Sequence, residues 1–253
     1  MVETQLTFTT QGLVIKELNV GENDRLITIF TKEYGILKAY ASGVKSIKSK
    51  RSAACSLLTY SSFTIKRKGE NYRITEADAI SSFFTMGMDV EVLSLCQYFC
   101  ELSSVFVERM NPNEEFLRLI LNSLHFITKN KKFPPLIKAI TEFRIAVISG
   151  YLPNLLTCEN CGKFEDDVIF FNMSEGSLIC KDCTDSLDGL TPLDRTSLSA
   201  LMHIAYSEFS KLYSFSVPEK SAVALSKITE KYLTLQIDYK FSTLDFYHSI
   251  INY

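Results

Sequence analysis

Cys158-Glu-Asn-Cys161, followed by Cys180-Lys-Asp-Cys183, is the stretch of this sequence that decides most about the fold. Each pair has two residues between its cysteines, and 18 residues separate the pairs. A C-x2-C turn offers two thiolates to one ion, and a second such turn completes the tetrahedron that Zn²⁺ prefers. The spacing therefore predicts one Zn²⁺ ion held by Cys158, Cys161, Cys180 and Cys183.

The residues between the two pairs have the pattern of a short hairpin. The apolar runs Val168–Phe171 and Leu178–Ile179 lie on either side of a turn candidate, Met173–Ser177, and Gly162 follows the first pair. This pattern predicts a zinc ribbon at about residues 154–187. Four protein thiolates leave no position for a catalytic water, so the predicted ion holds a fold and does no chemistry. The alternatives are a pair of redox dithiols and a site that has kept its cysteines without metal.

The first 80 residues have the pattern of a small β-barrel. Short runs rich in β-branched and aromatic residues alternate with turn segments that contain glycine, asparagine and aspartate. The predicted strands are Gly12–Lys16, Arg25–Thr31, Gly35–Ala41, Ser62–Lys66 and Tyr72–Thr75. About five short strands in about 80 residues are typical of such a barrel, and an OB-fold is one of this kind.

After Met88 the apolar residues recur with helical spacing. The predicted helices cover Val90–Val107, Phe116–Ile127 and a stretch from Pro134 to Gly150. Two more begin beyond the ribbon, one with Thr191 as N-cap and the other after Pro218. We therefore expect an α+β multidomain chain, with an N-terminal OB-fold β-barrel at 1–80 and an α-helical domain at 81–253 that contains the inserted zinc ribbon.

The cysteine content of the chain indicates the cellular compartment. The chain of 253 residues has seven cysteines and a formal net charge of −2. An odd cysteine count, a C-x2-C site and no apparent leader sequence favour a reducing cytoplasm, and no apolar run of membrane-spanning length is present. Outside the predicted metal site, Cys96 and Cys100 lie four residues apart, which predicts packing in a helical core.

Basic residues concentrate in two segments of the N-terminal part, which has a net charge of +4 against −6 for the rest. The candidate DNA contacts are Lys45, Lys48, Lys50 and Arg51 in one segment and Lys66, Lys68 and Arg73 in the other. If both segments meet on one face of the barrel, they form a groove for phosphates. The alternative is a solvated loop and an ordinary hairpin edge, because lysines also protect edge strands from aggregation.

Aromatic side chains of the same part are candidates for stacking on bases. Tyr40 and Tyr72 are the two favoured for that role, whereas Phe63 alternates in phase with Ile65 and is expected to face the core. The sequence contains no P-loop, G-x-G-x-x-G, G-x-S-x-G or H-E-x-x-H motif. We therefore expect no enzymatic activity and no catalytic residues, and a zinc-dependent hydrolase is disfavoured by the closed metal site.

Three stretches of the chain resemble the RecO family of bacterial recombination mediators. They are Gly12–Gly35, which contains Gly21-Glu-Asn-Asp-Arg-Leu-Ile-Thr-Ile-Phe-Thr-Lys-Glu-Tyr-Gly35, the basic loop Gly43-Val-Lys-Ser-Ile-Lys-Ser-Lys50, and Gly150–Cys183. The resemblance implies an OB-like domain followed by a helical domain with a zinc ribbon. It also implies binding and annealing of single- and double-stranded DNA and, with RecR, loading of RecA onto single strands coated by SSB.

Further expectations about partners and location follow from the same resemblance. The helical part is expected to bind the acidic C-terminal tail of SSB, with Lys129, Lys131, Lys132 and Arg144 among the basic residues near suitable helices. The protein is expected in the bacterial cytoplasm, associated with the nucleoid. The competing hypothesis is a non-enzymatic protein-interaction scaffold without a direct DNA role, and salt-sensitive binding of oligonucleotides separates the two.

Overall fold

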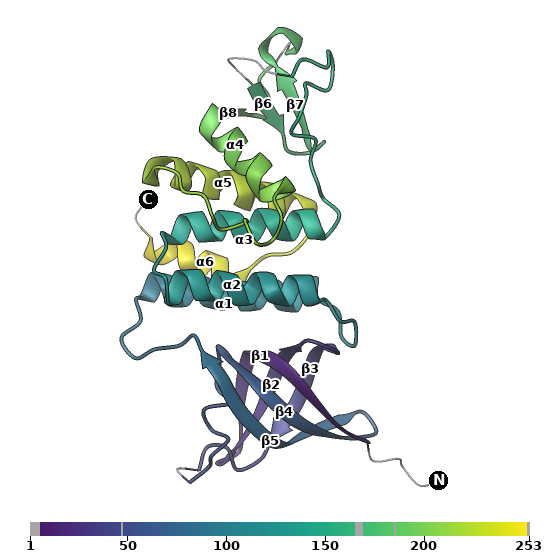
Figure 1. Cartoon of the computed structure of the whole chain (residues 1–253), viewed down its shortest axis with the longest axis vertical. Coiled ribbons are helices and arrows are strands. Elements are labelled where there is room, and N and C mark those ends of the chain that lie inside the picture. The colour runs from purple at the N-terminus through teal and green to yellow at the C-terminus, as the bar shows by residue number, and fades with distance from the viewer. Residues whose placement is uncertain (1–5, 47, 165–168, 185, 252–253) are drawn as a thin grey trace. The chain divides into compact units, whose positions relative to one another are not determined.

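In the computed structural model, which describes residues 6–46, 48–164, 169–184 and 186–251, five N-terminal strands close into a barrel (Figure 1). The strands are β1 (Leu6–Val20), β2 (Asp24–Thr31), β3 (Gly35–Ala41), β4 (Thr59–Lys68) and β5 (Asn71–Ser82). Their order around the barrel is β1-β2-β3-β5-β4, and only the β3–β5 pairing is parallel. This is the five-stranded barrel of an OB-fold, which confirms the predicted fold of the N-terminal part.

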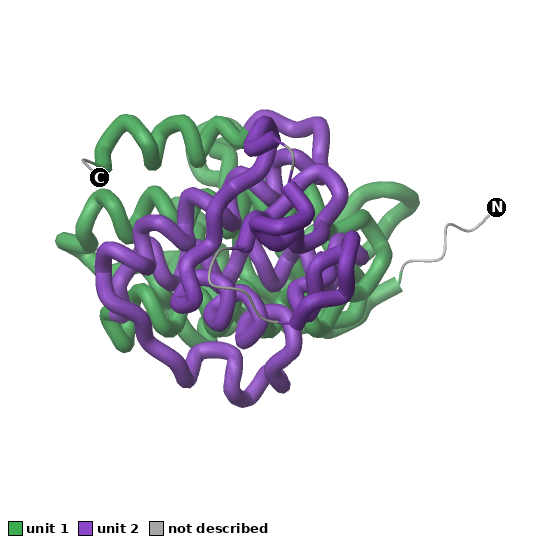
Figure 2. Tube along the Cα trace, turned by 90° about the horizontal axis from the view of Figure 1, so that it is seen from above, with its two compact units in different colours: residues 1–131, 241–252 green, residues 132–240, 253 purple. Residues whose placement is uncertain are grey.

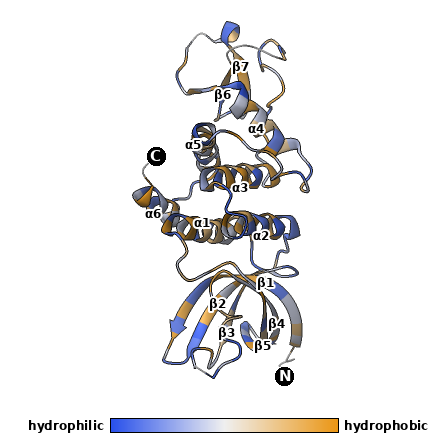
Figure 3. Cartoon of the chain, turned by 60° about the vertical axis from the view of Figure 1, so that its left-hand side comes forward, coloured by the Kyte–Doolittle hydropathy of each residue, from blue (hydrophilic) through white to orange (hydrophobic). Residues whose placement is uncertain are grey.

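The strands form because apolar and polar side chains alternate along them, as the alternating colours of the barrel in Figure 3 show. In β3, Leu37 and Ala39 are buried, whereas Lys38 and Tyr40 between and after them are exposed. In β4, Phe63 and Ile65 are fully buried in the barrel core, as predicted from their phase. The exposed face of β3, β5 and β4 is therefore free to carry a binding surface.

Strand β1 is long enough to join two neighbours. Its first part pairs with β4, from Leu6 opposite Arg67 to Leu13 opposite Tyr60. Its pairing with β2 runs from Gly12 opposite Thr31 to Val20 opposite Asp24, with an irregularity between Val14 and Lys16. A bulge bends a strand and increases its twist, and this lets β1 pair with strands on both of its sides.

Helices α1 (Val90–Phe106), α2 (Glu114–Thr128) and α6 (Ser242–Ile250) belong to the same compact unit as the barrel. Phe30 and its neighbour Ile29 of β2 are both fully buried, although adjacent residues of a strand point to opposite faces. Ile29 faces the barrel core, whereas the Phe30 ring packs against Phe116 of α2, with ring centroids 6.0 Å apart. Gly35 has a φ of +59°, and a Cβ there would lie 2.4 Å from the carbonyl oxygen of Asn111. The segment between α1 and α2 thus approaches the barrel at a position that only glycine permits.

The cysteines outside the predicted metal site are core residues. Cys96 and Cys100 of α1 are buried, which confirms their predicted packing role. Burial raises the pKa of Cys96 to about 12 and that of Cys55, which is also buried, to about 11. Thiols with such pKa values are protonated at neutral pH and are poor nucleophiles.

A second compact unit contains residues 132–240 and is described by itself (Figure 2). Its helices are α3 (Pro134–Ile148), α4 (Arg195–Tyr206) and α5 (Glu219–Gln236). Its small sheet has the order β7-β6-β8, from β6 (Ile169–Asn172), β7 (Ser177–Cys180) and β8 (Leu190–Leu193), with a 3-10 turn η1 (Lys181–Cys183) after β7. The chain passes between the two compact units at residues 131–132 and 240–241. The predicted boundary at residue 80 follows the change from strands to helices, and it stays a prediction.

Helices α3 and α5 enclose a buried ionic cluster. Lys138 is 1% exposed, and its Nζ lies 2.8 Å from Glu142 Oε1 and 2.7 Å from Glu230 Oε2. Thr229 Oγ1 donates a hydrogen bond of 2.8 Å to the other oxygen of Glu142. Burial raises the pKa of Glu142, while the charge of Lys138 opposes that shift.

The predicted hairpin, the helix order and the insertion of the ribbon are confirmed, and one helix start is wrong. Thr191 does not cap α4, because it lies in β8 opposite Phe171 of β6. Asp194 is the N-cap, and its carboxylate accepts a hydrogen bond of 2.6 Å from Ser197 N. Strand β8 and helix α6 were not predicted, and Val168 of the predicted first ribbon strand lies outside the described residues.

Candidate functional site

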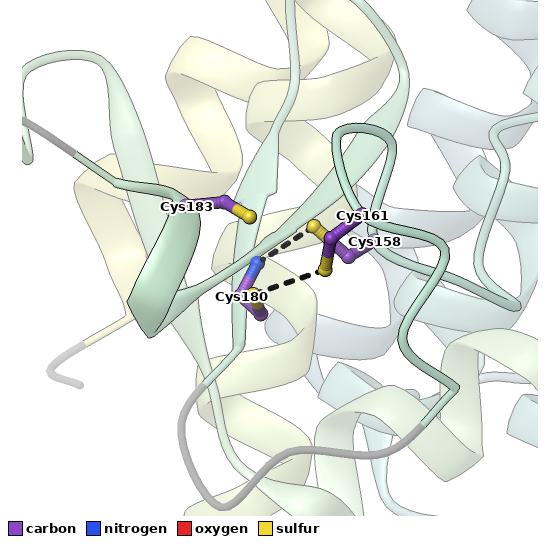
Figure 4. Close-up of side chains that lie close together, drawn as sticks. All are labelled: Cys158, Cys161, Cys180 and Cys183. Carbon is purple, nitrogen blue, oxygen red and sulfur yellow. Dashed lines mark hydrogen bonds between the residues drawn. The ribbon is translucent and has the colours of Figure 1, made fainter.

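The four cysteines of the two pairs converge at one point, as Figure 4 shows. Cys158 and Cys161 come from the loop before β6, whereas Cys180 ends β7 and Cys183 ends η1. All four sulfur atoms lie within 4.8 Å of one another, and those of Cys161 and Cys180 are 3.7 Å apart. A Zn–S bond of about 2.3 Å in a regular tetrahedron corresponds to a sulfur–sulfur separation of about 3.8 Å, so the spacing fits the ion.

Backbone hydrogen bonds hold the first knuckle in place. Gly162 has a φ of +71°, and its N–H donates to the carbonyl of Cys158 at 2.9 Å. The N–H of Cys158 in turn donates to Lys163 O at 2.9 Å. The N–H of Cys180 donates to Cys158 Sγ at 3.3 Å, which joins the two knuckles directly. These contacts orient the sulfurs toward a common centre.

The electrostatics of the cluster favour a bound cation. Burial acts to raise the pKa of Cys158, but hydrogen bonds from the backbone of Cys180, Cys161 and Asn160 outweigh it and lower that pKa to about 6. Hydrogen bonds with Cys161 and Cys180 raise the pKa of Cys183 to about 12. Thiolates at this spacing would repel one another, and a soft divalent cation would compensate their negative charge. The cluster can hold a metal ion and leaves no protein position open.

A second feature lies on the outer face of the barrel, across β3, β5 and β4. Tyr40 of β3 is opposite Arg73 of β5, and Arg73 is also opposite Lys66 of β4. One row across three strands therefore carries an aromatic ring and two cations. A groove of about 600 Å³ follows this row, and its lining residues are Tyr40, Lys66, Lys68, Asn71, Tyr72, Arg73 and Thr75. The structure thus brings together Lys66, Lys68 and Arg73, all of them exposed.

Two cations of this groove, Lys66 and Arg73, are not balanced by acids. Lys66 and Arg73 are directly opposite each other, an arrangement in which like charges destabilise a sheet. Within the described parts of the chain, no carboxylate lies within ion-pair distance of either residue. A pair of cross-strand cations without counter-charge is a suitable receptor for an anion.

The basic loop between β3 and β4 meets the groove through one residue. Arg51 donates to the carbonyls of Ser42 at 2.7 Å, Ile74 at 2.9 Å and Thr75 at 3.3 Å. Thr75 also lines the groove, so Arg51 fixes the end of the loop beside it. Lys48 and Lys50 are exposed and Lys45 is half-buried. Arg51 has a structural role that the sequence alone did not indicate.

The predicted stacking residues differ in their surroundings. The Tyr40 side chain is 43% exposed, whereas Tyr72 is 3% exposed and packs edge-on against Phe8 at 6.3 Å. The Tyr72 ring is therefore part of the barrel interior, because Tyr72 alternates in phase with Ile74 of the core. Only Tyr40 presents its ring to a ligand in the groove.

Among the four basic residues predicted near the helices for an acidic tail, Arg144 and Lys132 serve the fold. Arg144 of α3 donates to the carbonyls of Ile204 and Ala205 at 3.2 and 3.0 Å, near the C-terminus of α4. Lys132 Nζ donates to Tyr213 O at 2.6 Å. Sequence analysis missed Arg109, an exposed residue after α1 whose guanidinium lies 3.7 Å from Glu70 in the β4–β5 turn. Only the tertiary contact between Arg109 and Gly35 brings it there, so no local signal could have found it.

Comparisons with known proteins agree along the whole chain. Residues 5–83 match the family described as Recombination protein O N terminal, and residues 88–245 match Recombination protein O C terminal. A DNA repair protein RecO from Acetivibrio thermocellus is 32% identical over 94% of this chain and 94% of its own length. Another from Caldicellulosiruptor bescii is 28% identical over 95% of this chain and 98% of its own. No helix in the described residues is long and apolar enough to cross a membrane.

Proposed function

Since the chain belongs to the RecO family of DNA repair proteins, we propose that it binds DNA through the groove on its barrel and works as a recombination mediator. In this role it binds single- and double-stranded DNA, anneals complementary strands and, with RecR, helps to load RecA onto strands coated by SSB. The observation that carries the proposal is the row of Tyr40, Arg73 and Lys66 across three strands. Cations without an acidic partner on an OB-fold barrel face are suited to the phosphates of a nucleic acid.

The basic loop extends this site in the proposal. Lys45, Lys48 and Lys50 contact phosphates, and Arg51 positions the loop through its bonds to the backbone of β5. Lysine binds phosphate as a point charge and does not need a fixed geometry, which suits binding without sequence preference. Each neutralised phosphate lowers log K by roughly 0.7–0.9 per unit of log salt, so the proposal requires strongly salt-dependent affinity.

We also propose that the cysteine cluster holds one structural Zn²⁺ ion. The sulfur spacing, the backbone N–H donors and the four thiol ligands support that ion, and no step of a reaction is assigned to it. The protein then works without enzymatic turnover. Chelation should lower the melting temperature of the protein and release about one Zn²⁺ per chain. A protein that carries no metal as purified and does not change in stability with chelator would contradict this part.

Family membership supports further partners as proposals. These are RecR and the C-terminal tail of SSB, with RecA as an indirect partner. Exposed lysines near the end of α2, such as Lys129 and Lys131, remain candidates for contact with the acidic tail. Binding to DNA would associate the protein with the nucleoid in the cytoplasm.

The test is annealing of complementary oligonucleotides, with and without an SSB coat, by the wild-type protein and two variants. The first variant changes the groove, K66E/K68E/R73E. The matched control, K211E/K220E/K227E, changes three exposed lysines of the second unit and alters the net charge by the same amount. Annealing and salt-dependent binding should fall by more than about 100-fold in the groove variant and stay within about two-fold in the control.

The control separates a local site from bulk charge. Equal losses in both variants would show that net charge, not the groove, determines binding. Annealing retained in the groove variant would move the site to the basic loop, where K45E/K48E/K50E is the next variant. If the wild-type protein neither binds nor anneals DNA at low salt, the protein-interaction scaffold becomes the better explanation.

A further inference from the structure

Tyr40 is the only aromatic side chain that is exposed among residues 6–46 and 48–82 of the barrel. The other rings in these ranges are buried or half-buried. Phe30, Phe63 and Tyr72 are at most 3% exposed, and Phe8 and Tyr34 pack against the core and each other, with ring centroids 4.5 Å apart. Tyr60 of β4 is half-buried, donates to Gln11 Oε1 at 3.1 Å and does not line the groove. A nucleic acid in the groove therefore meets one exposed ring and not a series of rings.

Tyr40 lies where a base and its phosphate could be bound together. Arg73 is its direct neighbour across the parallel β3–β5 pairing, and Lys66 is the next residue of the row. Lys68 and Asn71, which are opposite each other on β4 and β5, line the same groove. Strands lie about 4.8 Å apart, so the Cα of Arg73 is about one strand spacing from that of Tyr40 and the Cα of Lys66 about two.

We propose that the groove binds single-stranded DNA with one base stacked on Tyr40, while the other bases in the site stay uncovered. This inference rests on the proposed DNA-binding function of the groove and adds which form of DNA the groove prefers. The cations hold the backbone, and a single ring holds a single base. The remaining bases are then available to a complementary strand, which is a physical basis for annealing rather than protection.

The physical reason for strand preference is that a base must leave its own stack to lie on a side chain. In a single strand a base can do so at little cost, whereas in a duplex stacking and pairing oppose it. Stacking on an aromatic side chain is worth roughly 1–3 kcal/mol per base, and it tolerates every sequence. Phosphate contacts by Lys66, Lys68 and Arg73 do not distinguish the two forms in this way. Tyr40 is thus the residue that favours single strands, and the three cations serve both.

The first experiment compares Tyr40→Ala and Tyr40→Phe in the full-length protein, with binding measured on an oligothymidylate and on a duplex of equal length. Tyr40→Ala should lower single-strand affinity about ten-fold and leave duplex affinity and the salt dependence of both unchanged. Tyr40→Phe keeps a ring and should bind as the wild type does. Equal losses on both DNA forms, or no loss on single strands, would overturn the proposal.

The second experiment measures how many bases the protein covers. Permanganate attacks thymines that are not stacked, so we would treat an oligothymidylate of about ten nucleotides with and without saturating protein. Protection equivalent to about one thymine per bound protein, lost in Tyr40→Ala, is expected. Protection of most thymines in the footprint would overturn the proposal, because it would require further stacking surfaces.

Failure of this inference is distinguishable from failure of the proposed function. If the groove variant K66E/K68E/R73E loses binding while Tyr40→Ala keeps its single-strand affinity, the groove binds DNA and the stacking role is wrong. If the wild type shows no salt-dependent binding to either form, the groove does not bind DNA and both are wrong.

Discussion

Lys138 and Lys66 carry the same charge in opposite settings. Lys138, between α3 and α5, is 1% exposed and lies within 2.8 Å of Glu142 and 2.7 Å of Glu230. Lys66, on the barrel, is exposed and lies opposite another cation, Arg73. Arg51 is an intermediate case, because it is half-buried and its guanidinium donates hydrogen bonds to three backbone carbonyls.

The difference separates charge that serves folding from charge that is available for binding. A buried cation is tolerated only with its counter-charges in place, so Lys138 belongs to the fold. An exposed cation beside a like charge gains little from the fold, and an anionic ligand can improve its energy. We therefore expect substitution of Lys138 to cost the most stability and the least DNA affinity. Substitution of Lys66 should do the reverse, and substitution of Arg51 should lie between the two.

The largest effect on stability is expected from Lys138→Met. Removing one partner of a buried ion pair leaves Glu142 without its compensating charge and should cost about 3–5 kcal/mol of unfolding free energy. Urea denaturation measures this, with Lys211→Met as the control on the exposed surface of the same unit. A loss below about 1 kcal/mol would mean that Lys138 is not needed by the fold, and the comparison would fail.

The pH dependence of the same variant sharpens this result. Burial raises the pKa of Glu142 above its ordinary 4.5, against the effect of Lys138. A carboxyl group with a raised folded-state pKa favours folding most below its unfolded pKa, and that contribution is lost as pH rises through the folded pKa. Without Lys138 the pKa rises further, so the destabilisation by Lys138→Met should grow from pH 4.5 toward pH 7.5. A constant or shrinking difference would contradict this assignment.

An intermediate effect is expected from Arg51→Met. The substitution removes charge-assisted hydrogen bonds to Ile74 and Ser42 and should cost about 1–2 kcal/mol. The exposed neighbour Lys50→Met is the matched control, since it removes one charge from the same loop. Thermal denaturation gives both values. Equal stability of the two variants would show that the hydrogen bonds of Arg51 do not stabilise the fold, and Arg51 would no longer be an intermediate case.

The smallest effect on stability is expected from Lys66→Met, within about 0.5 kcal/mol of the wild type. Its DNA affinity should nevertheless fall, and the slope of log K against log salt should become shallower by roughly 0.7–0.9. Fluorescence anisotropy at several salt concentrations measures that slope. Unchanged affinity with an unchanged slope would show that Lys66 contacts no phosphate.

Much of the fold follows from local patterns in the sequence. The period-two alternation that places Phe63 and Ile65 inside the barrel is a property of neighbouring residues, and the helical spacing of α1 is another. The cysteine cluster could be predicted because a C-x2-C turn constrains both of its sulfurs locally. Strand β8 could not, because it is four residues long, contains Pro192 and depends on pairing with β6.

The sequence by itself determined the barrel, the helices other than α6, the cysteine cluster and the segments that carry cations. Only the tertiary structure decided which of those cations are free. Arg51 and Arg73 look alike in sequence, but one donates to carbonyls at the end of a loop and the other lies in a row with Tyr40 and Lys66. The physical reason is that strand register and burial depend on contacts between distant residues, and these contacts determine whether a charge finds a partner.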